Sequence, residues 1–169
     1  CACSADFVAP KSAGFLDCVG LFAATAGVEA DNFAKSLKSE GKDYEAIIAA
    51  TLCDMIAEAY AKYLNQTKWR PFAACGGIRP ACGYPMWPDH SEKLEIWKLL
   101  NAEAKTGIRL TESFMMTPAA SVCGVWLPNP EAKYLNSVPV CRDQAERYAR
   151  LKGASYESIK RLLATAVSE

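Results

Sequence analysis

A short run rich in proline and glycine carries the residues best suited to recognising a ligand. It reads Gly-Ile-Arg-Pro-Ala-Cys-Gly-Tyr-Pro over residues 77–85. Pro80 restricts the backbone of Arg79, and a guanidinium held in this way can bind a carboxylate through two parallel hydrogen bonds. Gly83 lets backbone groups approach a bound molecule closely. The run alone predicts a rigid anion-binding loop, and an Arg79 that pairs with an internal Asp or Glu is the open alternative.

The eight cysteines could form a disulfide framework, bind a metal or remain free thiols. A framework is typical of small secreted domains, whereas 169 residues suffice for a substantial core. The sequence has no Cys-x-x-Cys pair and one histidine, His90, so we expect no zinc site. Cys53 falls on the apolar side of a predicted helix and Cys123 in a predicted strand, as small apolar residues do. We expect mostly buried thiols, no secretory signal and a cytoplasmic protein.

The charge balance argues against two classes of partner. Lys plus Arg and Asp plus Glu number 19 each, and no cluster of positive charge predicts binding to nucleic acid or to a membrane surface. The longest apolar stretch, residues 18–28, is too short to span a membrane and is interrupted by Gly20 and Gly27. Because the sequence begins Cys-Ala-Cys without an initiator methionine, we expect a fragment of a longer chain.

The spacing of apolar residues predicts which elements precede the loop. Residues 15–25 predict a buried strand, and residues 30–37 a short helix. A long helix is expected from Tyr44 to Leu64, with Asp43 as its cap and a wide apolar stripe along one side. The proline, glycine and aromatic residues that follow exclude a regular helix or a central strand.

A second group of elements is expected after the loop. Asp89 and Glu92 form a capping-box pattern that opens a helix ending at Gly107. The strand-like segments and helices that follow are predicted at 108–114, 122–127 and 134–140, then from Asp143 to Leu151 and after Ser155. Helices and strands are grouped rather than alternating. We therefore predict a single α+β domain over residues 1–169, with an antiparallel sheet flanked by helices.

The loop sequence is very similar to the Arg-Pro-x-x-Gly-Tyr-Pro signature of the C-terminal reactivation (activation) domain of cobalamin-dependent methionine synthase. Further stretches match that family in the same order: Asp-Phe-Val-Ala-Pro-Lys at 6–11, Pro-Asp-His-Ser-Glu-Lys at 88–93, Leu-Thr-Glu-Ser-Phe at 110–114, Ala-Lys-Tyr at 132–134, Arg-Asp-Gln at 142–144, Tyr-Ala at 148–149 and Lys-Gly at 152–153. The resemblance extends over nearly the whole chain. It implies an activation-domain-like fold that lacks its N-terminal portion.

The resemblance also implies a function. In that family, the domain binds S-adenosylmethionine, an electron arrives from flavodoxin or a flavoprotein reductase, and inactive cob(II)alamin is converted to methylcobalamin. The chain would be the reactivation module of a 5-methyltetrahydrofolate–homocysteine methyltransferase. Cobalamin would be bound by a partner domain of the same enzyme, and zinc would belong to a separate homocysteine domain. Since the sulfonium already activates the methyl group, such a module aligns the reactants and needs no catalytic side chain.

The resemblance places four cofactor-binding residues in the loop itself. Arg79 would hold the carboxylate of the methionine part. Backbone groups of Ala81 and Gly83 would receive the adenosine part, and Tyr84 belongs to the same signature.

Three further cofactor-binding residues would come from outside the loop. Tyr134 falls at the binding tyrosine of the family, where its ring could attract the sulfonium cation, and Leu135 takes the place of a second aromatic residue. Glu58 matches an acidic residue near the amino-acid end of the ligand, with a solvated helix carboxylate as the alternative.

Several departures from the family pattern favour a different function. The connection between residues 64 and 78 is short, and residues 73–75 stand where the family has an acidic residue. The family carboxylate for the ligand's ammonium lies upstream of Cys1, and Pro139 predicts an edge or distorted strand. The alternative is a truncated or diverged relative that docks on a cobalamin-binding domain as a non-catalytic interaction module. A third hypothesis, a stand-alone sensor of S-adenosylmethionine, has no residue in its favour.

Overall fold

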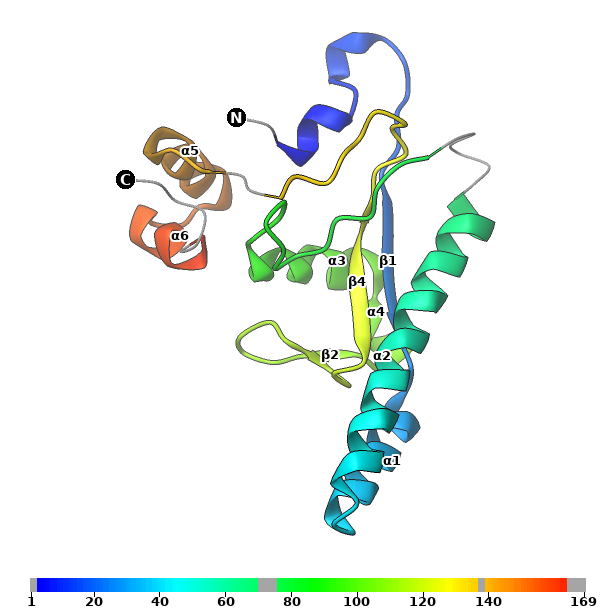
Figure 1. Cartoon of the computed structure of the whole chain (residues 1–169). Coiled ribbons are helices and arrows are strands. Elements are labelled where there is room, and N and C mark those ends of the chain that lie inside the picture. The colour runs from blue at the N-terminus through cyan, green and yellow to red at the C-terminus, as the bar shows by residue number, and fades with distance from the viewer. Residues whose placement is uncertain (1–2, 70–75, 137–138, 164–169) are drawn as a thin grey trace.

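Two antiparallel strands form the centre of the fold (Figure 1). The computed structural model describes residues 3–69, 76–136 and 139–163. In it, β1 (Gly20–Thr25) pairs with β4 (Ser121–Trp126), and the register runs from Gly20 opposite Trp126 to Thr25 opposite Ser121. A second pair joins β2 (Arg109–Leu110) to β3 (Met116–Thr117). The α+β class with antiparallel pairing is confirmed, although the strands form two small sheets rather than one.

The predicted strands are longer than the observed ones. The segment after residue 14 becomes regular only at Gly20, and Phe15 and Leu16 upstream are exposed. The strand expected at 108–114 ends at Leu110 because Phe114 adopts a left-handed φ of 61°, which turns the chain into β3. The prediction of a strand at 134–140 is wrong over residues 134–136, which pair with no strand among the described residues.

The first two helices pack against each other, and the second of them packs along β1 and β4 (Figure 1). They are α1 (Val28–Ser39) and α2 (Asp43–Leu64), and a π-helical turn (Asn65–Trp69) continues α2. Asp43 is the first residue of α2 rather than its cap. Only small residues of α2 are buried, namely Ala46, Cys53, Ala57 and Ala61. The large residues of the predicted apolar stripe are instead 42–75 % exposed, namely Tyr44, Ile47, Ile48, Leu52, Met55, Ile56, Tyr60 and Tyr63.

The helix predicted after Asp89 is divided into three pieces. A 3₁₀ turn (His90–Glu92) leads into α3 (Lys93–Leu100), and Asn101, with a φ of 52°, separates it from α4 (Ala102–Thr106). The Asp89 carboxylate accepts a hydrogen bond from the Ser91 N–H at 2.8 Å, so it caps this start as predicted. The structure shows no reciprocal bond from the Glu92 side chain to the backbone of Asp89.

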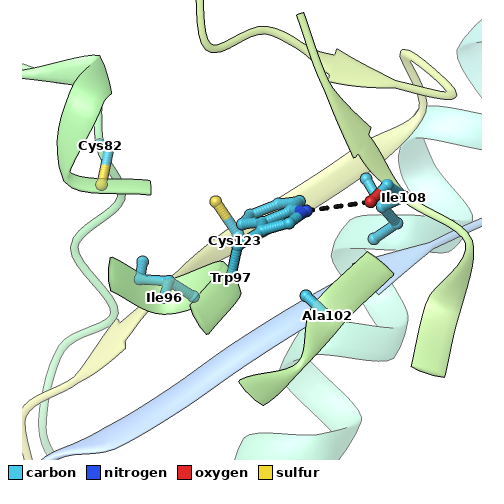
Figure 2. Packing of buried hydrophobic residues seen from close by; sticks show 6 residues of the cluster. All are labelled: Cys82, Ile96, Trp97, Ala102, Ile108 and Cys123. Carbon is cyan, nitrogen blue, oxygen red and sulfur yellow. Dashed lines mark hydrogen bonds between the residues drawn. The ribbon is translucent and has the colours of Figure 1, made fainter. Parts of the chain in front are cut away.

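The main core lies between α3, α4 and the central strands. Figure 2 shows its buried side chains, namely Cys82, Ile96, Trp97, Ala102, Ile108 and Cys123. The indole N–H of Trp97 donates to the carbonyl of Ile108 at 2.9 Å, so the ring is buried with its polar atom satisfied. All six described cysteines are free, but only Cys53, Cys82 and Cys123 are buried.

The last two helices form a separate pair at the far side of the molecule from α1 and α2 (Figure 1). They are α5 (Arg142–Lys152) and α6 (Tyr156–Leu162), which begin and end close to the predicted positions. The Ser155 hydroxyl accepts from the Ser158 N–H at 3.2 Å, as expected of a cap. None of the helices described here is long and apolar enough to cross a membrane.

Candidate functional site

A cavity of about 450 Å³ collects most of the residues that the sequence singled out. Its lining comes from β1, α2, the loop after residue 78, the start of α3, β3, the central strand β4 and the segment after residue 133. The lining residues are Phe22, Glu58, Arg79, Pro80, Ala81, Cys82, Tyr84, Pro85, Met86, Lys93, Met116, Ser121, Val122, Cys123, Tyr134, Leu135 and Asn136. Of the seven predicted ligand-binding residues, only Gly83 is not part of this lining.

The loop is held against the end of β4 by backbone hydrogen bonds. Ile78 and Leu127 exchange two of them, at 3.1 and 3.0 Å, and the Val125 N–H donates to the carbonyl of Pro80 at 3.0 Å. Gly124 makes this approach possible, since a Cβ at that position would lie 2.4 Å from the Pro80 oxygen. The residues on either side of Arg79 are therefore fixed by the central strands.

Arg79 contributes a cation that no carboxylate of the described residues neutralises. Its backbone N–H donates to the Tyr134 hydroxyl at 2.9 Å, which joins the two segments most closely associated with the site. Within the described part of the chain, its guanidinium forms no ion pair. The alternative of an arginine paired with an internal Asp or Glu is therefore not found among these residues. A guanidinium in this state can bind an incoming carboxylate.

Glu58 contributes the opposite charge. It lies on α2, lines the same cavity and is exposed, and it too forms no ion pair with a described residue. The cavity therefore presents a cation and an anion that are not paired with each other. Such an arrangement complements a zwitterion, whose carboxylate and ammonium are also separated.

Three of the other predicted residues surround these charges in different ways. Tyr84 and Tyr134 are 63 % and 58 % exposed, so their rings are accessible at the cavity. Leu135 is half-buried and packs against the apolar cluster of Ile78, Met86 and Leu127. Leu135 therefore also anchors the segment that carries Tyr134.

Gly83 shapes the loop from behind the cavity. It adopts a φ of +98°, which favours glycine, and its N–H donates to the Trp87 carbonyl at 2.7 Å. The imidazole of His90 occupies the space beside it, because a Cβ on Gly83 would lie 2.1 Å from the Cε1 atom of that ring. Ala81 contacts the cavity, whereas Gly83 gives the turn its shape.

The sequence analysis did not place four buried polar or ionisable residues in the lining, namely Cys82, Lys93, Ser121 and Cys123. Lys93 is only 3 % exposed. The one sequence signal that could have pointed to it was its place in the matched stretch 88–93. Burial raises the pKa of Cys82 to about 12, with the nearby Cys123 as a second cause. Burial also raises the pKa of Cys123 to about 11, so both thiols are protonated at neutral pH. Across the described residues, no group of three or more His, Cys, Asp or Glu could hold a metal ion.

Comparison with known proteins agrees with this geometry. Residues 1–153 match the family model described as "Vitamin B12 dependent methionine synthase, activation domain". The chain belongs to this family. The activation domain is also similar to a solved structure described as the crystal structure of the MetH reactivation domain bound to AdoHcy, with 42 % sequence identity and a TM-score of 0.90. That match covers 98 % of this chain and 56 % of the other, so the chain spans little more than half the length of this relative.

Proposed function

We propose that this activation-domain chain binds S-adenosylmethionine in the cavity around Arg79 and presents its methyl group for reactivation of the cobalamin of methionine synthase. The observation that carries the proposal is the pair of opposite charges, Arg79 and Glu58, which line one cavity without pairing with any described residue. The 42 % identical relative bound to AdoHcy, which is S-adenosylmethionine without its methyl group, supports the ligand class.

The cavity suits this ligand in size and in chemistry. A volume of about 450 Å³ is within the range of pockets that hold cofactor-sized molecules. The amino-acid end would place its carboxylate on the Arg79 guanidinium and its ammonium near Glu58. The adenosine would lie along Ala81 and Tyr84, and the exposed ring of Tyr134 would face the sulfonium.

The contribution of the protein to methyl transfer would be positioning. Cobalamin on a partner domain would supply the nucleophile that takes the methyl group, and flavodoxin or a flavoprotein reductase would supply the electron. The chain's own residues would fix both ends of S-adenosylmethionine and orient the methyl–sulfur bond toward the open side of the cavity. Because Cys82 and Cys123 stay protonated, they would not compete as nucleophiles for the methyl group.

Binding can be tested directly by titration calorimetry of S-adenosylmethionine and AdoHcy into the purified chain. We expect one site for each ligand, with competition between the two. Adenosine or methionine alone should bind much more weakly, because each occupies only one end of the cavity. A chain that is folded by circular dichroism and binds neither ligand would contradict the proposal.

A second candidate function is favoured by one observation. The large apolar side chains along α2 are exposed, for example Leu52 at 52 % and Met55 at 61 %. Such a face is typical of a surface that another protein element covers. A non-catalytic module that docks on a cobalamin-binding domain would use this face and would not need the cavity. Failure to bind S-adenosylmethionine, together with retained binding to a cobalamin-binding domain, would support this candidate.

A further inference from the structure

The ammonium group of Lys93, which lines the cavity, joins the start of α3 to the segment that leads into β3. The residue begins α3 and is 3 % exposed. Its Nζ atom lies 2.8 Å from Nδ1 of His90 and donates to the carbonyl of Phe114 at 2.9 Å. Of the carboxylates in the described part of the chain, none is within ion-pair distance of this ammonium.

The neighbouring acidic groups are already used elsewhere. Asp89 and Glu92 both pair with Lys152, at 2.5 and 2.8 Å, and both contact the Tyr148 hydroxyl. Burying an ammonium without a carboxylate is costly, and an apolar side chain would serve stability at least as well. Packing alone therefore does not explain a lysine at this position.

The contact with Lys93 determines the state of the His90 ring. An ammonium has only N–H donors, so Nδ1 must be the acceptor in this contact, and the proton of the neutral imidazole must then be on Nε2. The pKa of His90 is lowered, first by burial and then by the positive charge of Lys93, which agrees with a neutral ring. The ring is thus fixed in one tautomer and one orientation.

The fixed ring lies directly against the ligand loop. Its atoms occupy the space beside Gly83, where a Cβ would be 2.1 Å from Cε1 and 2.6 Å from Nε2. The residues on both sides of Gly83, Cys82 and Tyr84, line the cavity. On the other side of the ammonium, Phe114 leads into β3, where Met116 lines the same cavity.

We propose that Lys93 and His90 are positioning residues for the ligand loop: the ammonium fixes the proton and orientation of the imidazole, and the imidazole supports the turn at Gly83. The inference rests on the proposed function for the identity of the ligand. Its account of His90 and Gly83 does not depend on that ligand.

The test uses the single histidine of the chain. In protein labelled with ¹⁵N, the imidazole signals belong to His90 without ambiguity, and we expect a protonated Nε2 and an unprotonated Nδ1 at neutral pH. In Lys93→Met, the fixed tautomer should be lost and the amide signal of Gly83 should shift. AdoHcy affinity should fall about tenfold, as for the loss of one charge-assisted hydrogen bond. Lys98→Met, at an exposed lysine on the same helix, should change none of these.

A second variant keeps the test decisive if Lys93→Met does not fold. His90→Phe retains a ring beside Gly83 but removes the acceptor, so we expect a folded protein with weakened AdoHcy binding. A protonated Nδ1 in the parent chain would overturn the inference, as would parent-like affinity in His90→Phe. If the parent chain binds no AdoHcy, the proposed function fails, whereas the tautomer of His90 and the Gly83 signal still decide the role of Lys93.

Discussion

At the scale of single residues, the proposed recognition of the ligand rests on two charges that have no ion-pair partner among the described residues. Arg79 and Glu58 line one cavity, and neither forms an ion pair within the described residues. The loop around Arg79 could be predicted from its sequence because Pro80 and Gly83 restrict the backbone locally. Lys93 could not, since the burial of a lysine depends on the segments folded around it and not on its neighbours in sequence.

Replacing Glu58 tests the anionic side of the cavity. Glu58→Gln should weaken AdoHcy binding by about two- to fivefold, because an exposed ion pair contributes at most about 1 kcal/mol. The difference in AdoHcy affinity between Glu58→Gln and the parent chain should shrink as the salt concentration rises. Calorimetry on this variant and on Glu45→Gln, an exposed residue of α2 outside the lining, measures it. Equal affinities in both variants and the parent would show that Glu58 is only a solvated helix carboxylate.

At the scale of elements, two contacts position the site: the small-residue face of α2 and the carboxylates that begin α3. Ala46, Ala57 and Ala61 let α2 approach the rest of the fold closely enough for Glu58 to reach the cavity. Asp89 and Glu92 join the start of α3 to Lys152 at the end of α5. The sequence predicted the extent of α2 and α5 well, but it predicted one helix where α3 and α4 are separate. It also assigned the large residues of α2, rather than the small ones, to the packed side.

The two faces of α2 should differ in how strongly a substitution changes the free energy of unfolding. Ala57 is fully buried, so Ala57→Leu should lower the free energy of unfolding by about 1–3 kcal/mol through overpacking. Leu52 is 52 % exposed, so Leu52→Gln should change it by less than about 0.5 kcal/mol. Urea unfolding followed by circular dichroism compares the two variants. If Leu52→Gln lowered the free energy of unfolding by more than Ala57→Leu does, the face of α2 that carries Leu52 would have to be packed in this chain.

The stability contributed by the contact of Asp89 with Lys152, which joins the start of α3 to α5, should depend on pH. Burial alone would raise the pKa of Asp89, but hydrogen bonds from Lys152, Ser91 and Tyr148 lower it below its ordinary value. A depressed pKa contributes stability that is fully present above the unfolded-state value, about 4, and is lost as the pH falls through the folded-state value. Asp89→Asn should therefore lower the free energy of unfolding at pH 7 by about 1.5–3 kcal/mol.

The pH profile of unfolding provides the check on Asp89. The difference in free energy of unfolding between Asp89→Asn and the parent chain should shrink steadily below about pH 4, where the Asp89 carboxylate becomes protonated in the unfolded chain before it does so in the folded one. Asp31→Asn is the matched control, because Asp31 pairs with Lys35 on the surface of α1 and should contribute less than about 1 kcal/mol. A difference for Asp89→Asn that stays constant from pH 7 to pH 3 would contradict this account.

At the scale of the whole molecule, the site exists because the fold brings distant segments together. The grouping of helical and strand-like patterns was enough to predict an α+β fold, and the motifs were enough to predict the family to which the chain belongs. Local patterns do not specify partners, so the pairing of β1 with β4, about a hundred residues apart, could not be predicted. For the same reason the segment at 134–136 was assigned to a strand, whereas the Tyr134 hydroxyl instead contacts the backbone of Arg79.

The central claim, that Arg79 receives the carboxylate of an adenosyl amino acid, is tested most directly by calorimetry with two ligands. These are AdoHcy and the analogue that lacks only its carboxylate. The parent chain should bind AdoHcy about ten- to hundredfold more tightly, because one charge-assisted contact contributes roughly 1.5–3 kcal/mol. Arg79→Leu should bind the two ligands equally, and Arg79→Lys should recover only part of the difference. Equal affinity of the parent chain for both ligands, or the same preference for AdoHcy in Arg79→Leu, would contradict the account.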